Sequence, residues 1–303
     1  MKTPKISLGS WAFSFGPFES GPWSWDRFVD FSADNGYDGV EINAQAPHPH
    51  PHQYDTRAKC QELMTRLADK GLGVSGYAVN GHFPDMAAAA PATASPDQLI
   101  AALRPYLQFC TNAGIGALRF DTASPPDELE PGEYEKRFAN AVRCLRAAAG
   151  AAADHGVTMM WEFEPGFWLN KPSEVVRLHD AVDHAHFKLL FDTSHAYMGA
   201  VAASRHTGAP EKLAGGTAEY AALIRDRMGH LHVIDSDGEL HDDDTSTHIA
   251  FGEGYVDFPA TLEALKPRLA DMSWWCVDFC FNPAGPAAAR AAVPYLHNLA
   301  GSL

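Results

Sequence analysis

The 303-residue sequence lacks any stretch approaching the roughly 20 consecutive apolar residues with which a helix spans a bilayer. Basic residues are also scarce: 23 Lys and Arg stand against 38 Asp and Glu, for a formal net charge of −15. So acidic a protein repels nucleic acid and anionic lipid, and we expect neither as a partner. Small molecules remain as the expected ligands.

Cysteine is sparse as well, and its pattern excludes a disulfide framework. The five cysteines are an odd number, and no Cys-x-x-Cys motif occurs among them. This usage predicts free thiols in a reducing compartment. The first residues lack the apolar run of a secretory signal, so we expect a cytoplasmic protein.

Short apolar runs alternate with amphipathic segments along the whole chain. Glycine closes several of these segments, as at Gly36, Gly71 and Gly114, where a helix C-cap is expected. The expected strands are 6–13, 37–43, 74–79, 115–121, 157–164, 187–195, 228–233 and 274–278. The expected helices are 25–35, 56–70, 96–113, 134–155, 173–184, 218–227, 258–269 and 287–299.

Eight strand-then-helix units predict a parallel sheet that closes into a (β/α)8 TIM barrel, with residues 1–303 forming a single domain. A doubly wound open sheet is the main alternative. Such a sheet usually carries a glycine-rich phosphate loop after an early strand. No Gly-x-Gly-x-x-Gly or Walker motif follows any expected strand, which favours the barrel.

Four of the expected strands carry a carboxylate or an imidazole at or near their carboxyl ends, at Glu164, Asp192, His232 and Asp278. In a barrel the carboxyl ends of the strands meet at one rim, where the active site lies. A carboxylate within an apolar strand is costly unless it is paired or bound to metal. Oxygen donors with one imidazole suit a divalent cation, so we predict that these four residues bind one.

A second layer is expected beneath these residues. Side chains two apart on a strand face the same way, which places Glu162 below Glu164 and His230 below His232. We interpret His230 as structural. We interpret Glu162 as a partner of the metal ligands that orients a histidine.

Other residues near the expected rim are candidates for contact with a ligand. His195 is either a fifth ligand, a group that hydrogen-bonds substrate, or a solvated loop histidine. Arg119 and His248 are either donors to substrate oxygens or structural residues of the rim. Trp11 and Trp168 offer aromatic faces of the kind that a sugar site uses.

Three histidines, His48, His50 and His52, alternate with prolines between residues 46 and 52. Closely spaced histidines suggest metal binding. Alternation with proline, however, predicts an extended loop over the rim. We interpret this loop as a lid or an oligomer contact.

The motifs at the strand ends resemble those of the xylose isomerase-like TIM barrels, the sugar phosphate isomerase/epimerase superfamily. The matching pieces are Glu164-Pro165, Asp192-Thr-Ser-His195, His230-Leu-His232-x-x-Asp235, Gly252-Glu-Gly254-Tyr-Val-Asp257 and the carboxylate Asp278. The resemblance implies Mn²⁺ or Mg²⁺, with Co²⁺ or Zn²⁺ as alternatives, bound by Glu164, Asp192, His232 and Asp278. It also implies that His195 and Glu253 lie near substrate.

The resemblance implies a metal-dependent isomerase or epimerase of a keto-sugar or polyol. In this hypothesis a carbon-bound proton next to a metal-held oxygen is removed to give an enediolate, with Glu164 and Asp278 as base and acid. Loss of a β-substituent gives the main alternative, a lyase of the inosose dehydratase or 3-keto-glycoside-cleaving type. Metal-assisted phosphodiester hydrolysis and a sugar-binding barrel without catalysis are less favoured. Association into a homo-oligomer or with a partner subunit is typical of such barrels.

Overall fold

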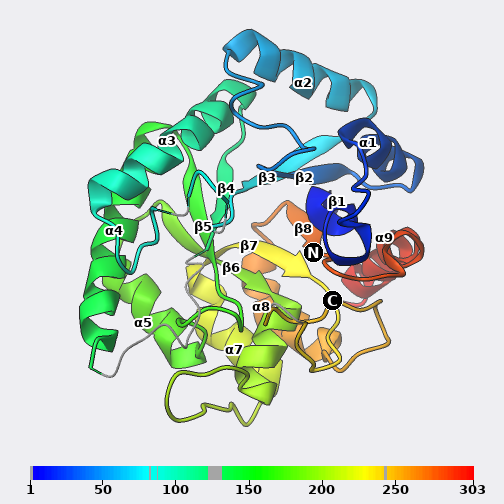
Figure 1. The fold of residues 1–303 in the computed structure, drawn as a ribbon. Helices are drawn as coiled ribbons and strands as arrows, with labels where there is room; N and C mark the ends of the chain where they lie inside the picture. The colour runs from blue at the N-terminus through cyan, green and yellow to red at the C-terminus, as the bar shows by residue number, and fades with distance from the viewer. Residues whose placement is uncertain (1–2, 82, 87, 122–131, 242–243) are drawn as a thin grey trace.

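The computed structural model describes residues 3–81, 83–86, 88–121, 132–241 and 244–303. Eight parallel strands pair in sequence order, and β1 pairs with β8, which closes the sheet (Figure 1). The strands are β1 (Lys5–Gly9), β2 (Gly39–Asn43), β3 (Gly73–Ala78), β4 (Ala117–Phe120), β5 (Thr158–Glu162), β6 (Phe187–Asp192), β7 (Met228–Val233) and β8 (Trp274–Val277). The predicted (β/α)8 TIM barrel is confirmed.

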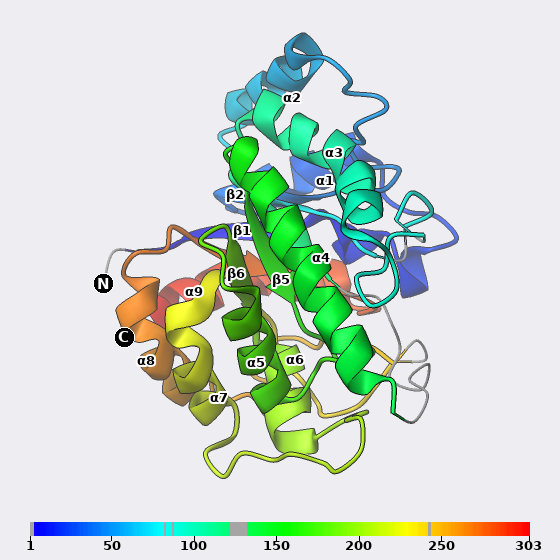
Figure 2. The same ribbon diagram turned by 90° about the vertical axis from the view of Figure 1, so that its left-hand side faces the viewer.

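Helices surround the barrel, as Figures 1 and 2 show. They are α1 (Trp25–Asp34), α2 (Arg57–Asp69), α3 (Pro96–Ala113), α4 (Tyr134–Asp154), α5 (Pro172–Val182), α6 (Thr193–Tyr197), α7 (Gly216–Ile224), α8 (Phe258–Leu269) and α9 (Gly285–Gly301). In the described part of the chain, no helix combines the length and the apolar character that crossing a membrane requires.

The helices begin and end where local sequence signals place them. Ser24, Thr56 and Ser95 precede α1, α2 and α3, and each side-chain oxygen accepts a hydrogen bond from the backbone N–H three residues later. Helix α3 ends at Gly114, whose φ of 74° lies in the left-handed region that glycine enters without steric cost. These caps explain why the sequence located the helix ends closely.

Alternate side chains of the barrel strands point outward to the helices and inward to the barrel interior. Along β5 and the residue after it, Met159, Trp161 and Phe163 are buried in the main hydrophobic core, between the barrel and its helices. Glu162, on the opposite face of the strand, points into the barrel. The sheet therefore delivers charged groups to its interior while its outer face anchors the helices.

Two glycines make room for side chains inside the barrel. A Cβ at Gly76 would lie 3.2 Å from the carboxyl carbon of Glu41, and one at Gly9 would lie 2.4 Å from the ring of Trp11. Without a Cβ at these positions, both large side chains fit against neighbouring backbone.

Three strands end two or more residues earlier than the sequence predicted. The expected strand 6–13 is divided, because β1 ends at Gly9 and Ser10–Phe13 form a 3₁₀ helix. Strand β5 ends at Glu162, two residues before the expected end. The expected strand 187–195 is divided, because β6 ends at Asp192 and α6 begins at Thr193. The Asp192 carboxylate accepts a hydrogen bond of 2.8 Å from the backbone N–H of His195, so the last residue of the strand also caps the helix.

Candidate metal centre

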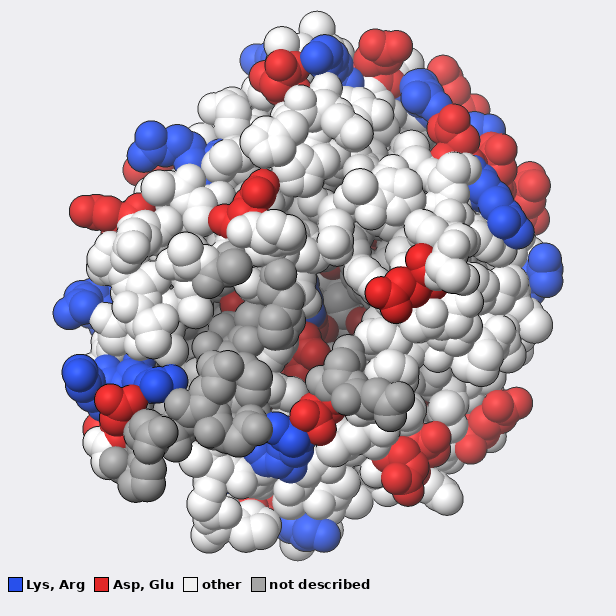
Figure 3. All heavy atoms as spheres, in the orientation of Figure 1, with Lys and Arg blue, Asp and Glu red and all other residues white. Residues whose placement is uncertain are grey.

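A cavity of about 350 Å³ opens at the carboxyl ends of the strands. Figure 3 shows the hollow near the middle of this face, with Asp and Glu atoms visible inside it. Its aromatic lining consists of Trp11, Phe15, Phe83, Phe167 and Phe281. Its polar lining includes Asn43, Gln45, Asn80, Arg119, Glu162, Glu164, His195, Thr245, His248 and Asp278. Apolar faces beside a few convergent polar groups are typical of a small-molecule site.

Four side chains from the ends of β5, β6, β7 and β8 meet at this cavity. Glu162, Asp192, His232 and Asp278 each offer a ligand atom within 4.8 Å of the others. The Nδ1 atom of His232 lies 3.1 Å from Oε1 of Glu162 and 3.2 Å from Oδ2 of Asp278. All four residues are buried. We call this group the tetrad.

The sequence prediction placed Glu164 in this group, whereas the structure brings Glu162 there instead. Glu164 lies two residues further along the same wall and lines the cavity. Its carboxylate accepts hydrogen bonds from Arg119 at 2.9 Å and from the Thr245 hydroxyl at 3.0 Å. It is therefore a neighbour of the tetrad rather than one of its members.

The stagger of the strands explains this difference. Glu162 pairs with Leu190, which precedes Asp192 by two residues, and Asp192 pairs with His232. His232 pairs in turn with the residue two positions before Asp278. Barrel strands tilt against the barrel axis. Side chains at the same height along the axis therefore come from residues that are shifted in the hydrogen-bond register from one strand to the next. The last polar residue of a strand is thus an unreliable guide to which side chain lies at the height of the tetrad.

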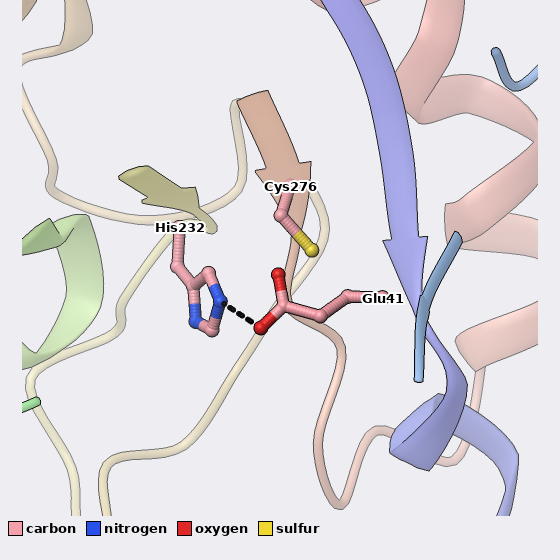
Figure 4. A group of neighbouring side chains, drawn as sticks. All are labelled: Glu41, His232 and Cys276. Atoms are coloured by element: carbon pink, nitrogen blue, oxygen red, sulfur yellow. Dashed lines mark hydrogen bonds and ion pairs between the residues drawn. The ribbon is translucent and has the colours of Figure 1, made fainter. Parts of the chain in front are cut away.

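A second layer beneath the tetrad fixes the orientation of His232. Figure 4 shows the Glu41 carboxylate between His232 and Cys276. One Glu41 oxygen lies 3.3 Å from Nε2 of His232, and the other lies 2.6 Å from Nε2 of His230. Burial opposes ionisation of Glu41, but attraction to the two histidines lowers its pKa below the usual range. Glu41 therefore turns Nδ1 of His232 towards the other tetrad members.

The donor set of the tetrad fits a divalent cation. Three carboxylates and one imidazole are a common combination for such ions. Metal bonds of about 2.1 Å at right angles separate neighbouring ligand atoms by about 3 Å, close to the 3.1 and 3.2 Å distances around His232. The buried Oδ2 of Asp192 has no hydrogen-bond partner among the residues that the structure describes. A cation at this point would satisfy it.

Arg119 holds three carboxylates on one wall of the cavity. Its guanidinium pairs with Glu162, with Asp121 at 2.6 Å and with Glu164 at 2.9 Å. Burial acts against ionisation of Glu162, yet Arg119 and His232 lower its pKa to about 2. Burial raises the pKa of Glu164 to about 8, helped by the charges of Glu162 and Asp121 against the opposing Arg119. The two neighbouring glutamates thus differ in protonation at neutral pH.

His195 and His248 both line the cavity, where the sequence placed them as candidates. The Ser246 hydroxyl lies 2.6 Å from Nδ1 of His195 and 3.3 Å from Nε2 of His248. Nδ1 of His248 lies 3.4 Å from a carboxylate oxygen of Asp278. The two imidazole rings, 5.4 Å apart between centroids, form the wall beside the tetrad.

The two predicted tryptophans have different surroundings. The Trp11 indole N–H donates to Asp278 at 2.5 Å, and its ring lies 5.5 Å from that of His232. Trp168 is fully buried outside the cavity and packs edge-on against Tyr134. Its neighbour Phe167 lines the cavity in its place.

Glu253, expected near substrate, is exposed and lies outside the cavity lining. The motif around it has a structural role instead. The Asp235 carboxylate accepts hydrogen bonds from the backbone N–H groups of Gly252 at 2.9 Å and Gly254 at 3.0 Å. These bonds close the loop after β7 and turn Glu253 outwards.

The sequence reasoning missed Glu41 and the amides Asn43, Gln45 and Asn80 of the lining. Glu41 carried a usable signal, because it is a carboxylate inside an apolar strand, like the four residues that were identified. The amides carried none, since amides at strand ends and in loops are common and their positions depend on the closure of the barrel.

Residues 29–297 match the family described as xylose isomerase-like TIM barrel. The chain belongs to this family. No curated protein matches the chain. The family's fold and the strand-end position of the tetrad agree with the rule that barrel active sites lie at the carboxyl ends of the strands.

Solved structures similar to this member of the family cover nearly its whole length. D-psicose 3-epimerase in the presence of D-fructose has 14% identity and a TM-score of 0.73, covering 98% of this chain and 99% of that one. The IolI protein with a bound zinc atom has 16% identity and a TM-score of 0.72, covering 98% of each chain. A probable 3-DHS dehydratase, AsbF from Bacillus anthracis, has 14% identity and a TM-score of 0.70, covering 96% of this chain and 98% of that one. At these identities the likeness shows the shared fold alone.

Proposed function

We propose that this protein is a divalent-metal-dependent isomerase or epimerase of a keto-sugar or polyol. The observation that carries the proposal is the tetrad, which meets at a cavity of sugar size. A solved epimerase and a zinc-bound protein of the same fold support it. A divalent cation, when bound, polarises a carbonyl or hydroxyl oxygen and so makes the neighbouring carbon-bound proton more acidic. Mn²⁺ or Mg²⁺ suits the oxygen-rich donors best, with Co²⁺ and Zn²⁺ as alternatives.

Glu162 and Asp278 are the proposed proton carriers. They belong to the tetrad and also line the cavity, and they come from the two outer strands of the β5-to-β8 group. A substrate carbon held between them has one carboxylate towards each face. Removal of a proton on one face and return on the other inverts the carbon, whereas return at the neighbouring carbon isomerises the sugar. Glu162 thus takes the role that the sequence suggested for Glu164.

Surrounding residues keep these two carboxylates in place and contact the substrate. Arg119 holds Glu162, and the Trp11 indole holds Asp278. With a pKa raised to about 8, Glu164 is protonated at neutral pH and donates a hydrogen bond to a substrate oxygen. His195 and His248 contact substrate from the adjoining wall.

A lyase is the second candidate, and it is favoured by two neighbouring glutamates that both line the cavity, Glu162 and Glu164, the second with a raised pKa. A buried carboxylic acid beside an ionised carboxylate is the pair that an elimination needs, one to remove a proton and one to protonate the leaving hydroxyl. A dehydratase also occurs among the solved structures of this fold.

The setting of the enzyme is proposed from its composition. Four of the five cysteines are buried free thiols, as suits a reducing compartment, so we propose a cytoplasmic location. Small sugars are the proposed partners. Association with itself or with a partner subunit stays a prediction.

The test is a screen of the manganese-loaded protein in D₂O against keto-sugars, inososes and 3-keto-glycosides, followed by NMR. Deuterium at an inverted carbon identifies an epimerase. A carbonyl moved to the neighbouring carbon identifies an isomerase, and a new double bond identifies a lyase. We expect Glu162→Gln and Asp278→Asn each to lower turnover at saturating metal by about 10²–10⁴-fold, the usual contribution of general acid–base catalysis. Glu263→Gln, an exposed change on α8, is the matched control and keeps full turnover. If the wild-type protein neither incorporates deuterium into any of these compounds nor converts any of them to a new product, the chain is a sugar-binding barrel without catalysis.

A further inference from the structure

A second group of metal-ligating side chains lies on the rim, away from the tetrad. His50 and His52 stand in the loop between β2 and α2, and Asp85 stands in the loop between β3 and α3. Each offers a ligand atom within 4.8 Å of the other two. We call these three residues the rim triad. They lie outside the cavity lining, so nothing proposed above accounts for them.

The three histidines of the loop after β2 have different surroundings. His48 is buried, with Nε2 2.9 Å from the Ser14 hydroxyl. The Tyr77 hydroxyl donates to the Pro49 carbonyl at 2.9 Å and so holds the backbone between His48 and His50. From His50 the chain turns, because its carbonyl accepts a hydrogen bond of 2.9 Å from the backbone N–H of Gln53. The turn leaves the two remaining histidines side by side.

The geometry of the rim triad matches a metal site with three protein ligands. Oδ2 of Asp85 lies 3.7 Å from Nε2 of His50 and 3.4 Å from Nε2 of His52. Zinc bonds of about 2.0–2.1 Å in a tetrahedron separate ligand atoms by about 3.3–3.4 Å. The two imidazole rings have centroids 4.7 Å apart, close enough to bind one ion without moving the backbone.

We propose that His50, His52 and Asp85 bind a transition-metal ion of the zinc class, with water completing the coordination. Two imidazoles and one carboxylate favour zinc, nickel or copper over magnesium and manganese, which prefer oxygen. The open side of the site is available to solvent, because the His52 side chain is 73% exposed. The site is therefore distinct from the tetrad in place, donors and preferred metal.

Binding has a consequence for the cavity. The two loops that the ion would join also carry Gln45 and Phe83, which line the cavity wall. An ion at the rim triad would tie these two neighbouring loops together beside the cavity. It would also displace the 3.2 Å hydrogen bond from the His52 backbone N–H to Nδ1 of His50, since coordination at Nε2 places the ring proton on Nδ1.

Zinc stoichiometry of the full-length, metal-stripped protein tests the proposal. We expect the wild-type protein to bind one more equivalent of zinc at micromolar concentration than either His52→Ala or Asp85→Asn. We also expect at least about a tenfold loss of affinity for that equivalent in each variant, since each loses a direct ligand. His297→Ala removes an exposed histidine on α9 and serves as the control, with wild-type stoichiometry.

Zinc bound at the tetrad contributes equally to wild type and variants. The difference in zinc stoichiometry between them therefore reports on the rim triad alone. Circular dichroism confirms that each variant is folded. Cobalt substitution gives a second readout, because the rim site would contribute a visible absorption band that His52→Ala lacks. Equal zinc stoichiometry and affinity in wild type, His52→Ala and Asp85→Asn would overturn the proposal.

Discussion

The tetrad and the rim triad combine carboxylates and imidazoles in different proportions and in opposite settings. The tetrad lies at the ends of barrel strands, and its residues are 0–5% exposed. The rim triad lies in loops, and its side chains are 18–73% exposed. The sheet and surrounding side chains fix the tetrad in place. The rim triad is held only by two loops and faces solvent.

The difference teaches what burial demands of a ligand group. A buried carboxylate is costly unless an opposite charge or a donor meets it. The barrel supplies Arg119 and Trp11 to the tetrad carboxylates for this purpose, and the Glu41 carboxylate meets His232. Water satisfies the rim triad, which needs no such supports. Changes near the tetrad should therefore affect stability and metal affinity together, and changes in the rim triad should affect affinity alone.

The largest effect on stability is expected at Arg119. Replacement by Met leaves the ionised carboxylates of Asp121 and Glu162 buried without their cation, so the free energy of unfolding of the metal-free protein should fall by about 3–5 kcal/mol. Urea unfolding at pH 7 measures it. Arg66→Met, which breaks an exposed pair with Asp26, is the control and should cost no more than about 1 kcal/mol. Equal losses in the two variants would remove the distinction between buried and exposed groups.

A pH effect is expected from His48, the buried histidine of the loop between β2 and α2. Burial lowers its pKa from 6.5 to about 4. The folded state therefore resists protonation that the unfolded chain accepts, so this stability is complete above pH 6.5 and is lost as pH falls towards 4. Between pH 7 and 5 the wild type should lose about 2 kcal/mol more than His48→Gln, which keeps a polar atom near Ser14. Parallel pH profiles of the two proteins in urea unfolding would contradict this.

A smaller effect is expected at Glu41, the support of His232. Glu41→Gln keeps the volume but loses the charge that orients the imidazole, so manganese affinity should fall by about 10–100-fold. Calorimetric titration of the stripped protein measures the change. Zinc binding at the rim triad should be unaffected in the same variant, which makes the second site an internal control. Unchanged manganese affinity would show that the tetrad does not depend on this layer.

The smallest effect is expected at His52. His52→Ala should change the free energy of unfolding of the metal-free protein by no more than about 0.5 kcal/mol, because the side chain is mostly solvated. Thermal or urea unfolding tests this directly. A loss of several kcal/mol would mean that the loop depends on His52 for its structure, contrary to the comparison drawn here.

Much of the fold could be predicted from the sequence because its signals are local. Caps such as Ser95 and Gly114 fix helix ends within a few residues, and apolar runs mark strands between them. The site could be predicted only in part. Asp192, His232 and Asp278 lie together as expected, but the choice between Glu162 and Glu164 depends on the tilt of the strands, which no short window of sequence records.

Contacts made by loops were the least predictable. Asp85 meets His50 and His52 only because the loops after β2 and β3 lie side by side in the closed barrel. In the same way, Phe167 rather than Trp168 faces the cavity because the chain after β5 has left the regular alternation of a strand. Periodicity carries no information at such positions.

The most direct test is a crystal structure of the manganese-soaked protein with anomalous data collected at the manganese edge. We expect one strong peak about 2.1 Å from ligand atoms of Glu162, Asp192, His232 and Asp278, with Glu164 held by Arg119 outside the coordination sphere. A peak coordinated by Glu164 in place of Glu162, or no peak among the four residues, would contradict the metal centre proposed here.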